Sequence, residues 1–133
     1  MMPIELLWDN DHQSILRYDI GGAWAWEELH TAREKVFVMM DEASSHKIGT
    51  IIHFVEGKIG IPGDVTKHLG RFGDKSHPKA ALTVIVGAGM MMKLAFGGFQ
   101  SAFRVTTGKK VDFDYADTLD QARKKVLADL NRK

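Results

Sequence analysis

Two side chains suited to acid–base chemistry, those of His53 and Glu56, stand at the end of an apolar run, Ile48 to Val55. Ligands of open parallel sheets bind where the strands end, so His53 is a candidate for contact with a ligand and, with Glu56, for the base of a hydrolase. The interpretation that we favour is plainer: His53 is a strand residue, partly covered by a helix and hydrogen-bonded locally. The six histidines form no HxH or HxxxH pair, so their spacing indicates no metal site.

The turn after this run limits the chemistry further. Residues 56–63 read EGKIGIPG and contain no hydroxyl or thiol side chain. Nucleophilic catalysis needs such a group beside a base, and the first hydroxyl that follows is that of Thr66. We therefore expect Gly57, Gly60 and Pro62 to shape a surface that binds rather than one that reacts.

A second glycine-bearing turn, GAGMMM at residues 87–92, follows the apolar run Ala80 to Val86. Glycines after a strand let the backbone approach a pyrophosphate at a helix N-terminus. The third position of that fingerprint is Met92, where glycine or alanine is required. The turn is therefore interpreted as a tight connection between strand and helix, and we expect no cofactor.

Large apolar side chains complete the set of candidate binding residues. Trp24 and Trp26 enter the first expected helix, and tryptophan is enriched at binding hot spots, although we expect Trp26 in the core and Trp24 over a sheet edge. Three consecutive methionines, Met90 to Met92, cannot all face inward, so at least one is expected at the surface or in an interface. The candidate partner- or ligand-binding residues are Trp24, His53, Glu56, Gly57, Gly60, Pro62, Thr66, Met90 and Met92.

Composition excludes several classes of function. The chain has no cysteine, which rules out disulfides, thiolate catalysis and cysteine-bound metal centres. Its 133 residues, 44% hydrophobic and 26% charged, are typical of one globular domain spanning residues 1–133. A net charge of +1 does not favour nucleic acid as a partner. No stretch approaches about 18 consecutive apolar residues and no basic region precedes an apolar core, so we expect a cytoplasmic chain without stable membrane insertion.

The spacing of apolar residues predicts the elements that position these side chains. Five strands are predicted, at residues 4–8, 15–20, 48–55, 80–86 and 111–115. Four helices are predicted, over residues 26–44, 65–72, 91–103 and 119–130. The order strand, strand, helix, strand, helix, strand, helix, strand, helix predicts an α/β fold: a mixed, largely parallel five-stranded sheet with helices on both faces.

Finer features of this arrangement also follow from the sequence. The near-continuous apolar run at residues 48–55 suits a central strand buried on both faces, and the first two strands form a hairpin that supplies antiparallel edges. Thr118 and Gln121 fit a capping box that opens the last helix. Asp9 is expected to act as a turn residue, and Arg123 belongs to a basic helix face expected to be solvated.

Four features of the chain resemble one family. They are the start of the first helix, GAWAWEE at residues 22–28, the run at 50–55 with Pro62 in the following loop, the strand at 82–86, and the last helix opened by Thr118 and Leu119. In these the chain resembles the STAS domain superfamily, and within it the small bacterial single-domain proteins similar to the sporulation anti-sigma-factor antagonist. The resemblance covers nearly the whole chain and includes no catalytic signature.

The resemblance implies a non-enzymatic interaction module without a cofactor, which binds a protein partner or itself as a homodimer. Antagonist members of the family carry a phosphorylatable serine or threonine in the stretch that corresponds to residues 54–64, and this chain has neither there. We therefore expect a module without the usual phosphorylation switch. One alternative stays open: a carrier of a small apolar or lipidic ligand, suggested by the Trp, Met and Phe content and by the similarity of STAS domains to the CRAL-TRIO lipid-transfer fold.

Overall fold

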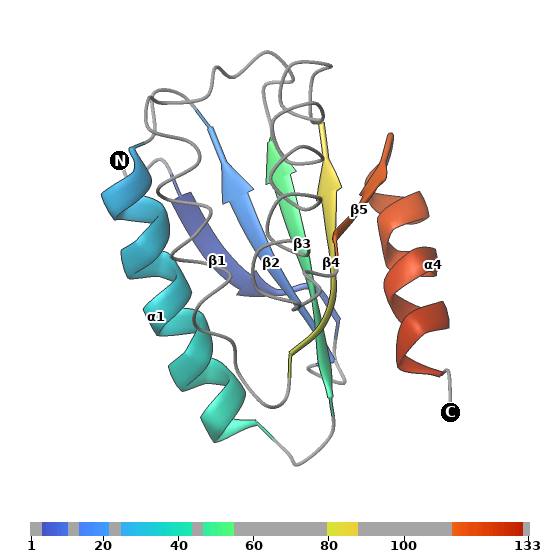
Figure 1. The fold of residues 1–133 in the computed structure, drawn as a ribbon, viewed down its shortest axis with the longest axis horizontal. Coiled ribbons are helices and arrows are strands. Elements are labelled where there is room, and N and C mark those ends of the chain that lie inside the picture. The colour runs from blue at the N-terminus through green and yellow to red at the C-terminus, as the bar shows by residue number, and fades with distance from the viewer. Residues whose placement is uncertain are drawn as a thin grey trace, which may run out of the picture.

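A computed structural model describes residues 4–10, 14–21, 25–43, 47–54, 80–87 and 113–131 of the chain. These residues form an α/β structure (Figure 1). Its elements are β1 Ile4–Trp8, β2 Ile15–Ile20, α1 Trp26–Glu42, β3 Ile48–Phe54, β4 Ala80–Val86, β5 Phe113–Ala116 and α4 Leu119–Leu130. The helices predicted over residues 65–72 and 91–103 lie outside the described residues, so the complete order of elements stays a prediction.

The five strands form one mixed sheet with the order β1-β2-β3-β4-β5, which Figure 1 shows from one edge to the other. β1 is antiparallel to β2, and the pairs β2–β3, β3–β4 and β4–β5 are parallel. The predicted mixed, largely parallel sheet is confirmed, as are the N-terminal hairpin and the central position of β3. The hairpin supplies only one edge, β1; the other edge is the parallel strand β5.

The first core cluster joins the sheet to α1. Its strand residues include Leu16, Tyr18 and Ile20, which alternate along β2 and therefore share one face. The residues of α1 in this cluster recur at three- and four-residue spacing, which gives the helix one buried face. They are Trp26, Leu29, Ala32, Val36 and Met40. The prediction that Trp26 belongs to the core is confirmed.

The second core cluster joins the sheet to α4. It contains Ile15 of β2 and Ile51 of β3, packed with Ala122 and Val126 of the helix. Successive side chains of a strand point to opposite faces, so Ile15 and its neighbour Leu16 place the two clusters on opposite sides of the sheet. Gly49 of β3 is required for this packing, since a Cβ atom there would collide with Val126.

The two described helices begin with different hydrogen bonds. At α4 the Thr118 hydroxyl accepts from the Gln121 amide at 3.2 Å, which confirms the predicted N-cap. The predicted capping box is wrong in its second half, because the Gln121 side chain accepts from the Asp117 amide at 3.0 Å and not from that of Thr118. At α1 the Glu28 carboxylate accepts from the Ala25 amide at 2.9 Å. Neither described helix is long and apolar enough to cross a membrane.

Candidate functional site

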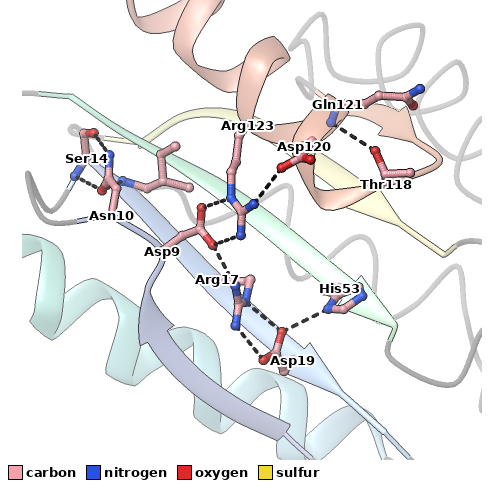
Figure 2. Close-up of polar contacts among 11 residues, drawn as sticks. Asp9, Asn10, Ser14, Arg17, Asp19, His53, Thr118, Asp120, Gln121 and Arg123 are labelled. Carbon is pink, nitrogen blue, oxygen red and sulfur yellow. Dashed lines mark hydrogen bonds and ion pairs between the residues drawn. The ribbon is translucent and has the colours of Figure 1, made fainter.

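Five side chains, from α4, β2, β3 and the residue after β1, form a continuous chain of polar contacts, drawn in Figure 2. Arg123 of α4 contacts Asp9, which directly follows β1; Asp9 contacts Arg17 of β2. Arg17 contacts Asp19, two residues further along the same strand, and Asp19 contacts His53 of β3. We call these five residues the polar network.

The alternation of side chains along β2 explains why the polar network forms on one face. Arg17 and Asp19 are two residues apart and follow Ile15 of the second core cluster, so all three share the face on which α4 packs. The register of the parallel pair β2–β3 sets Asp19 opposite His53. Side chains at opposing positions on one face are close enough to interact, which brings the carboxylate to the imidazole.

Asp9 is the buried anchor of the polar network, with a side chain only 1% exposed. Its Oδ2 accepts from Arg123 Nε at 2.7 Å, and its Oδ1 accepts from Arg123 Nη2 at 3.0 Å and from Arg17 Nη1 at 2.7 Å. Burial by itself would raise the pKa of Asp9, but the hydrogen bonds and charges of Arg123 and Arg17 outweigh it and lower this pKa below its usual range. Asp9 is therefore a carboxylate near neutral pH and unsuited to act as a general acid.

Asp19 holds His53 in a defined orientation. The carboxylate accepts from Arg17 Nε at 2.9 Å and from Arg17 Nη2 at 3.1 Å, a two-bond fork that fixes its plane. Its Oδ1 lies 3.2 Å from Nδ1 of His53. Because an ionised carboxylate only accepts hydrogen bonds, Nδ1 must be the donor, and in the neutral ring Nε2 is left as an acceptor.

This arrangement provides one hydrogen-bond acceptor in a fixed orientation, Nε2 of His53, and does not form a complete catalytic set. His53 is 24% exposed at its side chain and Asp19 is 21% exposed, so both are accessible at the edge of the polar network. Within the described residues, Asp19 is the hydrogen-bonding partner of His53, and no hydroxyl group contacts the ring. These residues also include no group of three or more His, Asp or Glu that could hold a metal ion.

One of the candidate residues from the sequence can be placed. His53 is a partly covered strand residue, as we expected, but its hydrogen bond is not local in the chain: its partner is Asp19 of the neighbouring strand β2. The other candidates lie outside the described residues, and their grouping into one surface stays a prediction: Trp24, Glu56, Gly57, Gly60, Pro62, Thr66, Met90 and Met92.

Two expectations about charged residues were incomplete, because each residue also has a partner that the sequence did not indicate. Asp9 is not merely a turn residue but a buried partner of two arginines, and Arg123 is not simply solvated, because its guanidinium is held by that carboxylate. Arg17 and Asp19 were missed altogether, although two charges at a spacing of two inside an apolar strand signal a polar strip on one face.

No protein-family model, curated protein or solved structure matches the chain.

Proposed function

We propose that this chain is a non-enzymatic, STAS-like interaction module that binds a protein partner or a second copy of itself. The observation that supports this most strongly is that each carboxylate of the polar network is shared by two neighbouring side chains. Asp9 is shared by two arginines, and Asp19 is shared by Arg17 and His53. An acid–base catalyst needs groups free to exchange protons with a substrate, whereas these carboxylates neutralise neighbouring cations and stabilise the fold.

The proposed fold is the full STAS-like order, with four helices distributed over both faces of the sheet. Two observations support it. The described strands have one antiparallel pair followed by three parallel pairs, and α1 and α4 belong to different core clusters. Parallel neighbours require crossover connections, which agrees with helices between β3 and β4 and between β4 and β5.

The proposed binding surface comprises residues 57–66 and 90–103, with His53 at its rim. His53 is the second-last residue of β3 and lies four positions before residue 57, where the first of these segments begins. Its Nε2 would accept a hydrogen bond from a backbone amide or a hydroxyl group of the partner. Such a contact orients a partner without any chemical step, which agrees with the lack of a hydroxyl or thiol in residues 56–63.

Native mass spectrometry of the purified chain tests this proposal against the alternative of an apolar-ligand carrier. An interaction module is expected to appear at the mass of the bare chain and its multiples. A carrier would instead retain a small apolar molecule, visible as added mass that disappears after extraction with organic solvent. A stoichiometric retained ligand would overturn the proposal in favour of the carrier.

The proposed lack of a phosphorylation switch has its own test. Incubation with cell lysate and ATP, followed by a phosphate-affinity gel, is expected to leave the chain unshifted. A chain with Thr66→Ala serves as the control for the first hydroxyl after the turn. Robust modification of the wild-type chain that disappears in this variant would show that a switch exists at Thr66, after the stretch that carries it in the antagonist members.

A further inference from the structure

Two large hydrophobic side chains are exposed in the described part of the chain: Val38 of α1, at 54%, and Leu127 of α4, at 42%. A single exposed apolar residue is ordinary in a folded protein. Val38 and Leu127 differ from ordinary exposed residues, because the charged side chains around Val38 are mainly acidic and those around Leu127 are mainly basic. Each is the apolar centre of a charged helix surface.

The surface around Val38 is acidic. Glu34 and Glu42 lie four residues before and after Val38, on the same side of α1, and both are exposed. Asp41 is exposed on the same side three residues after Val38, and Lys35 is the cation among these neighbours. We call Glu34, Val38, Asp41 and Glu42 the acidic surface.

The position of these acids in the helix adds a second observation. Asp41 and Glu42 fall in the last turn of α1, which contains no basic residue. The carbonyl end of a helix carries a partial negative charge, so acidic side chains are unfavourable there and a cation is favourable. A positively charged partner at this end of α1 would therefore be stabilised by both the carboxylates and the helix dipole.

The surface around Leu127 is basic. Lys124 is exposed one turn before it, and Arg123 lies beside Lys124, with its guanidinium shared between Asp9 and the exposed Asp120. The sequence continues after α4 with Arg132 and Lys133. Asp129, the other acid of this helix, accepts a hydrogen bond from the amide of Leu82 at 3.2 Å and so belongs to the sheet side. We call Lys124 and Leu127 the basic surface.

We propose that the acidic surface of one copy of the chain binds the basic surface of a second copy, with Val38 packed against Leu127. The inference rests on the proposed function and names its partner. Because α1 and α4 belong to core clusters on opposite sides of the sheet, each contact leaves one acidic and one basic surface free. Such a head-to-tail contact extends into an open chain of copies rather than closing a dimer. A contact between two single helices is small, so the association is weak and sensitive to salt.

Charge-reversed variants test this contact by nuclear magnetic resonance. The first variant, Glu34→Lys/Glu42→Lys, reverses the acidic surface, and the second, Lys124→Glu, reverses the basic surface. The matched control is Glu5→Lys, which changes an exposed carboxylate on the edge strand β1 and leaves the side chains of both helices unchanged. All four positions are exposed, so each variant is expected to fold, which its amide spectrum verifies directly.

Titration of a ¹⁵N-labelled chain with unlabelled copies gives the affinity. Wild-type chains are expected to shift amide signals of α1 and α4 as concentration rises, and Glu5→Lys to behave in the same way. Either reversed variant alone is expected to associate at least about fivefold more weakly. A mixture of the two variants is expected to recover binding, because the unchanged basic surface of the first variant meets the unchanged acidic surface of the second, and the two reversed surfaces meet each other. Amide signals of α1 and α4 are therefore expected to shift in both chains.

Three results would overturn the inference: no concentration-dependent shifts in the wild type, association that neither reversal weakens, or a loss of association that the mixture does not restore. None of these three results decides whether the proposed function is correct, because that function has its own test. Native mass spectrometry detects a retained apolar ligand whether or not the chain associates with itself. Failure of this contact and failure of the interaction-module proposal are therefore distinguishable.

Discussion

Arg123 of α4 and Asp9 at the end of β1 lie 114 residues apart in the chain and form a two-bond ion pair, with N–O distances of 2.7 and 3.0 Å. The carboxylate is 1% exposed, whereas the arginine side chain is 36% exposed. The pair connects the last described helix to the N-terminal hairpin. Arg17 contacts the same carboxylate and extends the connection along β2 to Asp19 and His53.

Replacement of Asp9 by asparagine is expected to lower the free energy of unfolding by about 3 kcal/mol, because two guanidinium groups lose the carboxylate between them. Urea unfolding measures this loss. The control is Asp120→Asn, which removes an 86%-exposed partner of the same arginine and is expected to cost no more than about 0.5 kcal/mol. Equal losses in the two variants would show that the buried pair contributes no more than a surface pair.

The lowered pKa of Asp9 predicts a pH dependence of stability with a definite sign. Since the folded-state pKa lies below the ordinary value of 3.8, the unfolded chain takes up a proton first as the pH falls. The contribution of Asp9 is therefore fully present above about pH 4 and is lost as the pH falls through the folded-state pKa. Urea unfolding as a function of pH should show a steeper acid loss for the wild type than for Asp9→Asn. Parallel profiles would contradict this assignment.

The sheet and its core could be predicted because their signals are local. The run Ile48 to Phe54 is apolar almost throughout, as a strand buried on both faces must be, and the spacing of Leu29, Val36 and Met40 marks the buried face of α1. Threonine is a favoured N-cap residue, so the position of Thr118 at the start of α4 could be predicted from its residue type. The sequence signal for each of these features lies within a short stretch of the chain.

The polar network could not be predicted in the same way, because its contacts join distant segments. Nothing in the residues around Asp9 indicates that Arg123 reaches it, and a short Asp-Asn stretch after a strand is the ordinary pattern of a turn. The pairing of Asp19 with His53 depends on the register of two parallel strands. A shift by one residue would send each side chain to the opposite face, and the sequence does not specify that register locally.

The tautomer of His53 provides a direct test of its orientation by Asp19. In the neutral ring, Nδ1 is expected to carry the proton, since it donates to the Asp19 carboxylate across 3.2 Å. Nitrogen chemical shifts of the ring distinguish the two tautomers. Asp19→Ala is expected to shift the ring toward the Nε2-protonated form, and Asp120→Ala is expected to leave it unchanged. A wild-type ring protonated at Nε2 would show that the contact does not orient His53.

The close approach of α4 to β3 at Gly49 predicts an interaction between two substitutions. Gly49→Ala introduces a Cβ that collides with Val126 and is expected to cost about 2 kcal/mol through overpacking. When Val126→Ala is added, the double variant is expected to be at least about 1 kcal/mol more stable than the sum of the two single losses predicts. Gly21→Ala is the control: a Cβ there meets no atom within 4 Å. Strict additivity in urea unfolding would contradict this packing.

Sedimentation velocity of the purified wild-type chain, followed from micromolar to millimolar concentration at low and at high salt, is the sharpest test of the contact between copies of the chain. That contact joins the acidic surface of one copy to the basic surface of a second copy. We expect a sedimentation coefficient that rises with concentration at low salt and returns toward that of the monomer at high salt, because salt screens the charged contact between Glu34, Glu42 and Lys124. A monomer at every concentration and at both salt levels would contradict it.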